Sequence, residues 1–294
     1  MQVSVIIVNY NTFELTSKCI QSIKRHATAI HYEIILVDNA STECDSESFL
    51  TEFPDIVLIK SEQNGGFAYG NNLGIEKAHG EYILLLNSDT VLVEDTLSKV
   101  VEYAGRQKKT GVIGCRMIYA DNRIQYSARR FRSISWELLD LFRFVLYMMS
   151  YKKRSKMMLG KYFRHDENID CDWVNGAFML IPRAVIQNLP GKKLDERFFM
   201  YGEDQLWCEQ IKDLGYRILF YSGTTIIHLG SASTSVKKHL SLRTIMMHNE
   251  LAIMKARKGE GVYYFFFKMI FTSKELSRNF IKSVFYKLTG RMIS

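Results

Sequence analysis

The chain has 294 residues, of which 47% are hydrophobic and three are proline, enough to bury the core of one large domain with or without appendages. The net charge of +8 is uneven: residues 1–120 carry 10 basic and 15 acidic side chains, whereas residues 236–294 carry 12 and 3. The acidic first part argues against a nucleic-acid partner. The basic tail and the basic segment 121–170 are instead candidate surfaces for a different anionic partner.

Two kinds of structural site are not expected from the cysteines. The five cysteines are widely separated and form no CxxC pair, so neither a structural zinc site nor a disulfide framework is expected, and a reducing cytosol fits best. The first residues, MQVSVIIVNYN, have no basic region before the apolar run, which favours a first strand over a signal peptide. No apolar run reaches the ~18 residues of a membrane-spanning helix.

Four short apolar runs, rich in β-branched residues, come at regular intervals in the first 90 residues. They are VSVIIV (3–8), EIILV (33–37), IVLI (56–59) and YILLLN (82–87). Their length favours buried parallel strands, and the helical patterns between them predict an α/β sheet with right-handed crossovers. Ligands bind such sheets beyond the carboxyl ends of the strands, and Asn9, Asp38 and Asp89 are expected there.

The second half of the chain has a looser pattern. Residues 129–164 contain ISWELLDLFRFVLYMM, apolar at helical spacing and flanked by basic stretches. Patterns typical of strands and helices become recognisable again in three segments. A further helix is expected near 239–257, before the aromatic, basic stretch VYYFFFKMIF. The three segments are WVNGAFMLIPR (173–183), FFMYGEDQLWCEQIKDLGY (198–216) and RILFYSGTTIIHLG (217–230). We therefore expect a domain over residues 1–235, with an insertion at 121–170, and a helical region over 236–294.

The glycine motifs of two common nucleotide-binding folds are missing. The turn after the first strand, NYNTFEL, contains no glycine, and the cluster NGGFAYGNN fits neither GxGxxG nor GxxxxGK[ST]. The sequence therefore disfavours both a dinucleotide-binding dehydrogenase and a P-loop enzyme.

Two polar positions near the first strands each allow a structural and a functional interpretation. Asp38, in LVDNAS, either caps the next turn or accepts a hydrogen bond from the imide N–H of a uracil or thymine. Asn64 with Gly65 and Gly66 either forms an ordinary turn, since glycine adopts positive φ freely, or closes over a nucleotide.

Three further positions carry groups suited to catalysis or metal binding. Asp89, in LLLNSDT, either closes an Asx turn or binds a hard divalent cation that bridges the phosphates of an activated donor. The acids of GED (202–204) either cap a helix or supply a general base for a substrate hydroxyl. His228 either makes a structural hydrogen bond or completes a metal shell as a neutral imidazole.

The order of these segments resembles the inverting GT-A glycosyltransferases of family 2, and within them the rhamnosyltransferase-like branch that builds bacterial surface polysaccharides. The resemblance covers residues 3 to about 235 and rests on VNYN, VDNAS, NGGFAYGNNLGI, LLLNSDT, WVNGAFMLIPR, FFMYGEDQLWCEQIKDLGYRI and IIHLGSAS. It implies the GT-A fold, a Rossmann-like and mostly parallel sheet flanked by helices, here followed by C-terminal amphipathic helices.

The resemblance also implies site residues. NSD stands in place of the DxD signature, with Asn87 where the first Asp is usual, which removes one charge from the metal site. Asp89 and His228 would bind Mg²⁺ or Mn²⁺, and Asp204 would be the catalytic base with Glu203 as its neighbour. Trp173, Asn175 and Gly176 would line the acceptor side. The nucleotide-sugar would be held by Asn9, Asp38 (on the base), Asn64, Gly65, Gly66, Asn71 (with Asn72), Asn87 and Ser88.

The implied reaction is a single displacement that moves a sugar, best L-rhamnose from dTDP-rhamnose, to a hydroxyl of a polyprenyl-diphosphate-linked glycan. The alternatives are the same chemistry with a UDP-hexose or galactofuranose donor, or a non-catalytic sugar-nucleotide-binding scaffold. The amphipathic stretches with their flanking Lys and Arg indicate helices on an anionic membrane surface, or else a homo-oligomer interface. The expected location is the cytoplasmic face of the bacterial inner membrane, or the cytoplasm.

Overall fold

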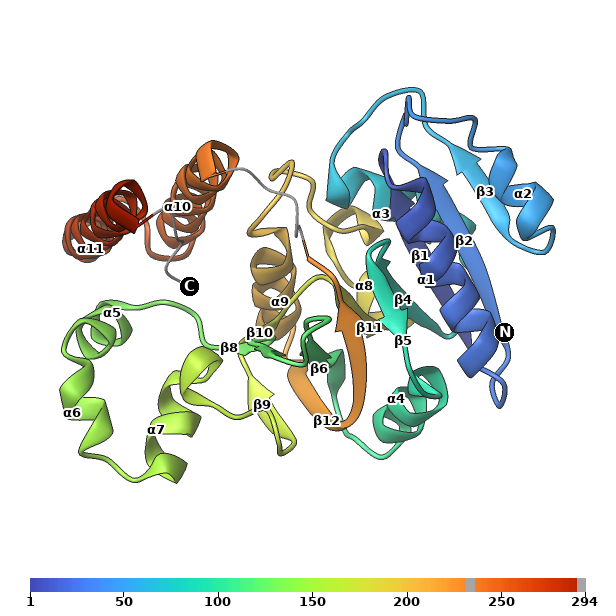
Figure 1. Ribbon diagram of the computed structural model, residues 1–294. Coiled ribbons are helices and arrows are strands. Elements are labelled where there is room, and N and C mark those ends of the chain that lie inside the picture. The colour runs from blue at the N-terminus through green and yellow to red at the C-terminus, as the bar shows by residue number, and fades with distance from the viewer. Residues whose placement is uncertain (231–235, 290–294) are drawn as a thin grey trace. The chain divides into compact units, whose positions relative to one another are not determined.

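The computed structural model describes residues 1–230 and 236–289, with side chains described for 1–230 and 242–284 (Figure 1). Residues 231–233, which end the motif IIHLGSAS, and residues 290–294 of the expected C-terminal region lie outside the described residues. The chain forms two compact units. Unit 1 comprises residues 1–130 and 159–232, and unit 2 comprises residues 131–158 and 233–294.

Unit 1 is built on a mixed ten-stranded sheet. One half is parallel, in the order β3-β2-β1-β4, and consists of β1 (Val3–Asn9), β2 (Tyr32–Asp38), β3 (Val57–Lys60) and β4 (Tyr82–Asn87). These are the four apolar runs of the sequence, and the predicted α/β class is confirmed. β1, β2 and β4 are mostly buried, as expected for strands with apolar side chains on both faces. The run at 56–59 was also expected to be a buried strand, but β3 lies at the edge of the sheet and its residues are partly or fully exposed.

The other half of the sheet continues as β11-β6-β12-β5. In it β6 and β12 are parallel, whereas β11 is antiparallel to β4 and β6, and β5 is antiparallel to β12. Two short strands extend it, β7 pairing with β6 and β9 pairing with β12, and β8 and β10 form a separate ribbon. The strands are β5 (Thr90–Leu92), β6 (Thr110–Ile118), β7 (Ile124–Gln125), β8 (Ala128–Arg129), β9 (Ile169–Cys171), β10 (Trp173–Val174), β11 (Phe178–Pro182) and β12 (Arg217–His228).

Helices cover both faces of this sheet. Alternate residues of β1 point to opposite faces, so Val5 and Ile7 pack with Ile20 of α1 in one apolar cluster, while Ile6 packs with Trp207 of α9 in another. The helices of unit 1 are α1 (Phe13–His26), α2 (Ser48–Glu52), α3 (Phe67–Lys77), α4 (Thr96–Gly105), α8 (Arg183–Gln187) and α9 (Glu203–Asp213), with 3₁₀ turns at Gly160–Tyr162 and Pro190–Lys192.

Unit 2 is entirely helical within its described residues. It combines part of the expected insertion with the C-terminal helices, around a small apolar cluster of Leu251, Met254, Phe267 and Phe271. Its helices are α5 (Ile134–Leu141), α6 (Arg143–Tyr147), α7 (Tyr151–Met158), α10 (Val236–Lys258) and α11 (Val262–Thr289). Within the described ranges, no helix is both long and apolar enough to cross a bilayer.

Helix α3 lies close to β1 because two of its inward positions are glycine. A Cβ at Gly70 would lie 2.8 Å from Cγ1 of Val8, and a Cβ at Gly74 would lie 2.5 Å from Cγ2 of Ile6. Both distances are shorter than van der Waals contact, so any larger residue would push the helix off the strand.

We therefore expect Gly74→Ala to lower the free energy of unfolding by about 1–3 kcal/mol through overpacking, although alanine favours a helix by about 1 kcal/mol over glycine. Gly105→Ala at the end of α4 is the matched control, since a Cβ there meets no atom within 4 Å. Urea unfolding midpoints measure both effects. A midpoint for Gly74→Ala at or above that of the wild type would contradict the close approach of α3 to β1.

Candidate active site

The carboxyl ends of β1 and β2 carry a buried polar pair. Asn9 and Asp38 are the last residues of these strands and stand opposite each other in the register. Nδ2 of Asn9 donates to Oδ1 of Asp38 at 2.9 Å and to Oγ of Ser41 at 3.0 Å, while Oδ1 of Asn9 accepts from the hydroxyls of Thr12 and Thr16, each at 2.9 Å. Oδ2 of Asp38 has no hydrogen bond within the described part of the chain, so it is free to accept from a ligand N–H.

The turn before α3 is fastened to the end of β2 by Asn39. Nδ2 of Asn39 donates to Oδ1 of Asn64 at 2.9 Å and to the carbonyl of Gly66 at 3.2 Å. Gly66 has φ +89°, and a Cβ there would lie 2.4 Å from the carbonyl oxygen of Phe199. The N–H of Phe67 donates to that same oxygen at 3.1 Å. The turn therefore requires glycine and contacts the loop that precedes α9.

The remaining residues expected around this turn have different surroundings. A Cβ at Gly65 would lie 2.3 Å from the ring of Tyr69, so the glycine makes room for this ring. Asn71 donates to the carbonyl of Phe67 at 2.8 Å, and its buried Oδ1 has no partner within the described residues. Asn72 bonds with the N–H and carbonyl of Leu194, at 2.9 and 2.8 Å, and with Glu196 at 2.7 Å. Asn72 therefore fastens α3 to residues 194–196.

The NSD segment meets the end of β12. Oδ1 of Asp89 lies 3.3 Å from Nε2 of His228, and Nδ2 of Asn87 lies 3.5 Å from the same nitrogen. Pairing of β12 with β5 sets this contact, because His228 stands opposite Thr90 in the register. Ser88 Oγ lies 3.1 Å from Oγ1 of Thr12, which links the segment to the end of β1.

Gln125 fixes the ring of His228. Its amide Nε2 donates to the carbonyl of His228, so its Oε1 is the atom that lies 2.7 Å from the ring nitrogen Nδ1 and accepts a hydrogen bond from the Nδ1–H. In a neutral ring the other nitrogen, Nε2, then carries the lone pair. That lone pair faces the Asp89 carboxylate, and a cation between the two would satisfy both groups. A carboxylate oxygen suits Mn²⁺ and Mg²⁺ and imidazole is the commonest protein metal ligand, so these two residues fit the expected metal. Within the described residues they are not joined by a third such side chain, because no group of three or more His, Cys, Asp or Glu residues that could hold an ion occurs there.

The first turn of α9 holds two adjacent carboxyl groups with unequal partners. Oδ2 of Asp204 accepts from the N–H of Gly176 at 3.1 Å, and Oδ1 accepts from the N–H of Gln205 at 2.8 Å. Glu203 is buried, and its Oε2 has no hydrogen-bond partner within the described residues. Burial and the Asp204 carboxylate raise the pKa of Glu203 to about 8.

The pKa of Asp204 is set by burial together with several hydrogen-bond donors. Burial raises its pKa above the ordinary value, although the N–H donors of Gly176 and Gln205 and the Arg129 guanidinium oppose the shift. Because hydrogen-bond donors favour a charged carboxylate, Asp204 is the member of the pair that ionises first. A carboxylate with a raised pKa is also the stronger base.

The turn beside Asp204 joins it to the NSD segment. Gly176 donates to Asp204, the next residue Ala177 accepts from the N–H of Asn87 at 3.1 Å, and Asn175 Oδ1 accepts from the N–H of Ala177 at 2.9 Å. Trp173, two residues before Asn175, is half-buried, with the Arg129 guanidinium 5.1 Å from its ring centroid. A continuous series of contacts thus runs from His228 to Asp204.

Sequence reasoning did not select Asn39, Gln125 and Arg129. Asn39 could have been found, because it follows Asp38 directly in VDNAS. Gln125 and Arg129 lie in two-residue strands, which are too short for a recognisable hydrophobic pattern.

Substituting Glu203 should change the pH dependence of stability. A carboxyl group whose pKa is raised by folding destabilises the native state as it ionises, so stability is lost between the ordinary pKa of 4.5 and about 8. Glu203→Gln cannot ionise, and its melting temperature relative to the wild type should rise from pH 5 to pH 9. Asp213→Asn, at the exposed end of α9, is the control and should follow the wild type. A constant difference between Glu203→Gln and the wild type would disprove the buried, protonated state of Glu203.

The family profile described as "Glycosyl transferase family 2" matches residues 4–171. The O-antigen biosynthesis protein RfbC of Myxococcus xanthus is 26% identical over 79% of this chain and 18% of its own length. Glycosyltransferase GlyG of Streptococcus pneumoniae is 31% identical over 38% of each chain. The rhamnosyltransferase WbbL of Escherichia coli is 25% identical over 77% of this chain and 83% of its own. The chain thus spans well under half the length of the first two of these relatives.

Solved structures of similar fold agree with this match. The mannosyltransferase PcManGT of Pyrobaculum calidifontis, in complex with GDP-Man and Mn²⁺, has a TM-score of 0.58 and 17% identity over 93% of this chain and 68% of its own. TarS of S. aureus, in complex with UDP, has a TM-score of 0.52 and 16% identity over 85% of this chain and 65% of its own. The fold is of the GT-A type, and the chain belongs to glycosyltransferase family 2.

Proposed function

We propose that the protein is an inverting glycosyltransferase that moves a sugar from a nucleotide-diphospho-sugar to a hydroxyl of a lipid-linked glycan. The observation that carries the proposal is the series of contacts that puts Asp89 and His228 on one side of Asn87 and Asp204 on the other. A pair of residues that could hold a cation and a half-buried carboxylate base, joined by these contacts, are the two groups that a single displacement of a diphosphate requires.

The donor would bind over the carboxyl ends of β1, β2 and β4. Oδ2 of Asp38 would accept from the base imide, a group that uracil and thymine share. Asn9 holds this carboxylate in place. The Asn64–Gly65–Gly66 turn would lie against the nucleotide, with Asn71 on the next turn of helix, and Asn87 and Ser88 would contact the ribose or the diphosphate.

Asp89 and His228 would hold Mg²⁺ or Mn²⁺. When bound, the ion neutralises the charge that develops on the leaving diphosphate. The protein's own contribution is to orient the two ligands: Gln125 fixes the imidazole, and the N–H of Leu229 donates to the carbonyl of Asp89 at 2.9 Å. Because Asn87 is neutral, this site has one negative charge fewer than it would have with an aspartate at that position.

Asp204 would act as the general base. The acceptor hydroxyl gives its proton to the Asp204 carboxylate while its oxygen bonds to the anomeric carbon, and the bond from that carbon to the diphosphate breaks. The nucleoside diphosphate leaves with the bonding electrons, and the anomeric configuration inverts. Trp173, Asn175 and Gly176 would lie on the acceptor side, and Glu203 would keep its proton at neutral pH, which leaves Asp204 as the charged member of the pair.

The donor that we propose is dTDP-L-rhamnose. The similarity to the rhamnosyltransferase WbbL over most of both chains supports this choice, and the imide acceptor at Asp38 suits thymine. A UDP-hexose suits the same acceptor equally well, and a relative from Bacillus spizizenii is a poly(ribitol-phosphate) beta-glucosyltransferase, 29% identical over 39% of this chain and 19% of its own length.

The acceptor that we propose is a polyprenyl-diphosphate-linked glycan at the cytoplasmic face of the inner membrane, in the synthesis of a bacterial surface polysaccharide. The name of RfbC, an O-antigen biosynthesis protein, supports this pathway class. A glycan built on a lipid carrier also requires the enzyme to work at a bilayer surface.

Asp204→Asn should reduce transfer by about 10²-fold or more, because a general base contributes at least that factor, while donor binding stays unchanged. The amide keeps the shape of the side chain, and Asp213→Asn at the other end of α9 is the matched control. Radiolabelled sugar transfer and equilibrium binding of the donor separate the two effects. Near-normal transfer by Asp204→Asn would move the base elsewhere, first to Glu203.

Asp89→Ala should abolish the metal dependence of donor binding. In a thermal-shift panel of dTDP-rhamnose, UDP-sugars and GDP-mannose, the true donor should raise the melting temperature in the presence of Mn²⁺ and less so with EDTA. For the Asp89→Ala variant, the donor should raise the melting temperature with Mn²⁺ no more than with EDTA. The surface variant Asp55→Ala should behave as the wild type. If no sugar nucleotide gives a shift, the NSD segment is not a working metal site for a donor.

A further inference from the structure

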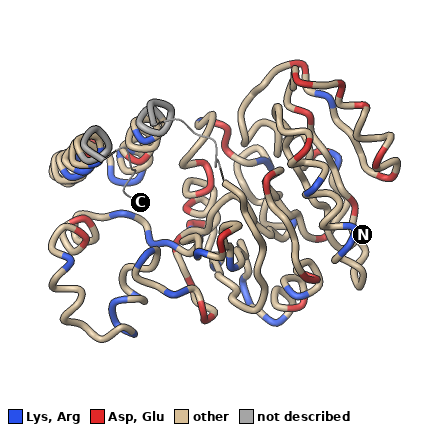
Figure 2. Tube along the Cα trace, viewed as in Figure 1, with Lys and Arg blue, Asp and Glu red and all other residues tan. Residues whose placement is uncertain are grey.

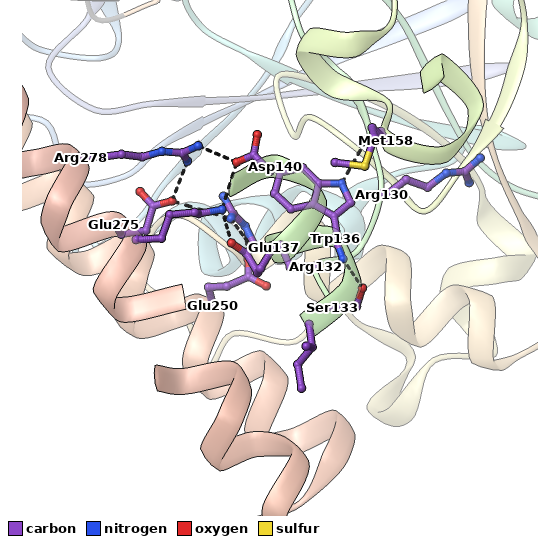
Figure 3. A network of polar contacts seen from close by, with 12 residues as sticks. Arg130, Arg132, Ser133, Trp136, Glu137, Asp140, Met158, Glu250, Glu275 and Arg278 are labelled. Carbon is purple, nitrogen blue, oxygen red and sulfur yellow. Dashed lines mark hydrogen bonds and ion pairs between the residues drawn. The ribbon is translucent and has the colours of Figure 1, made fainter. Parts of the chain in front are cut away.

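The interior of unit 2 holds charged side chains. Glu137 and Asp140 on α5 are 0% and 1% exposed, and Lys274 on α11 is 5% exposed. The ammonium of Lys274 pairs with Glu137 and lies 3.0 Å from Oδ2 of Asp140, which Arg278 also contacts at 2.6 Å. Two acids of the internal segment are thus neutralised by two bases of the C-terminal helix (Figure 3).

Arg132 extends this network to a third helix. Its Nη1 lies 2.7 Å from Glu137 and 3.9 Å from Glu275 of α11, and its Nε lies 3.6 Å from Glu250 of α10. The network therefore contains four acids, namely Glu137, Asp140, Glu250 and Glu275, and three bases, namely Arg132, Lys274 and Arg278 (Figure 3).

The outward face of α11 is apolar. The residues that point inward, Phe267, Phe271, Lys274 and Arg278, recur at spacings of three and four. Their spacing places them on one side of the helix. The opposite side carries exposed apolar side chains at the same kind of spacing: Phe265, Met269, Leu276 and Phe280, of which Phe265 and Phe280 are 63% and 71% exposed. The helix is thus charged on part of its inner face and apolar on its outer face.

Helices α5 and α6 add to the exposed apolar surface of unit 2. Leu141, Phe142, Phe144, Tyr147 and Met148 are all more than half exposed. Of the 27 large hydrophobic side chains that are exposed within the described residues, 17 belong to unit 2. Exposed apolar side chains in this number within one unit are typical of a surface that is covered by something else.

The net charge of unit 2 indicates which kind of partner covers its exposed apolar side chains. The unit contains 18 basic and 5 acidic side chains, a net charge of +13, whereas unit 1 has a net charge of −5. Four of the five acids lie in the buried network, and the fifth, Glu260, pairs with Lys255. The surface of the unit therefore presents basic side chains with almost no acids between them, as the Lys and Arg positions along α7 illustrate (Figure 2). A second copy of the unit would bring a like charge of +13 against it, which opposes self-association.

We infer that α11, together with α5 and α6, binds the surface of an anionic lipid bilayer. The exposed Phe, Met and Leu side chains enter the region between headgroups and acyl chains, and the Lys and Arg side chains contact anionic headgroups. With 28 residues, α11 is about 42 Å long at the usual rise per residue, and it would lie along the bilayer rather than across it. The inference rests on the proposed function for its biological role, since it places the enzyme beside a lipid-linked acceptor.

Vesicle sedimentation of the full-length protein tests this inference without any transfer step. Binding to phosphatidylcholine vesicles that contain phosphatidylglycerol should be about tenfold or more tighter than to phosphatidylcholine alone, and should weaken as salt is raised. The double variant Phe265→Gln/Phe280→Gln should lose about tenfold or more in affinity. Leu50→Gln/Leu214→Gln, two exposed apolar positions of unit 1, is the matched control and should bind as the wild type. Thermal unfolding checks that both variants are folded.

A second variant tests the charge contribution separately. Lys152→Gln/Lys153→Gln removes two exposed bases of α7 and should weaken binding to the anionic vesicles about tenfold, with a smaller dependence on salt. The inference is overturned if the protein binds neither kind of vesicle, or if the Phe265→Gln/Phe280→Gln variant binds as the wild type. A dimer that forms in solution and dissociates in that variant would assign the apolar face to a second copy. Each of these outcomes is independent of the donor shifts, which use dissolved sugar nucleotides.

Discussion

The in-register pairing of β1 with β2 and β4 is the constraint on which the donor side of the site depends. Pairing places Asn9 opposite Asp38, and Val8 opposite Asn87, so three strand ends that are far apart in sequence finish at one edge. Side chains alternate between the faces of a strand, so a slip of one residue would point the polar group away from the site. The apolar residues that precede each strand end therefore form the core and also fix the register of the strands. Because both faces of these strands are buried, only one register is compatible with the packing, and the position of Asp38 follows from it.

The parts that could be predicted from sequence are those that local patterns determine. The four parallel strands were identifiable from short β-branched runs, and the α/β class followed from their alternation with helices. What could not be predicted depends on long-range pairing. The strand β11 enters the sheet antiparallel between β4 and β6, and nothing in the run FMLIP indicates direction. Gln125, which sets the ring of His228, lies in a two-residue strand about 100 residues away from it. The roles of Asp89, His228 and Asp204 still rest on the family resemblance, and the structure adds which of their atoms have partners.

The contacts within unit 2 were still harder to predict from the sequence. Each amphipathic stretch was visible in the sequence, but the ion pairs of α5 with α11, and of Arg132 with α10, were not, because they join residues more than 100 positions apart. A charged residue in an amphipathic helix is ordinarily read as part of the solvent-facing side. Here the charged residues Glu137, Asp140 and Lys274 form the inner side. Losing one partner of such a buried pair typically costs about 3–5 kcal/mol, since the other charge is left without compensation. The helices of this unit are therefore interdependent in a way that helices joined by apolar contacts alone are not.

Arg129 forms an antiparallel bridge with Leu159, so the chain leaves unit 1 and re-enters it at one point. During synthesis the ribosome completes Glu137 and Asp140 well over a hundred residues before Lys274 and Arg278. The segment 131–158 can therefore form these ion pairs only after α11 has been synthesised, whereas the strands of unit 1 on either side of it can pair earlier. Folding of unit 2 is therefore expected to follow the pairing of those strands. A chain cut short before Lys274 would keep the strands of unit 1 but would leave Glu137 and Asp140 without that base.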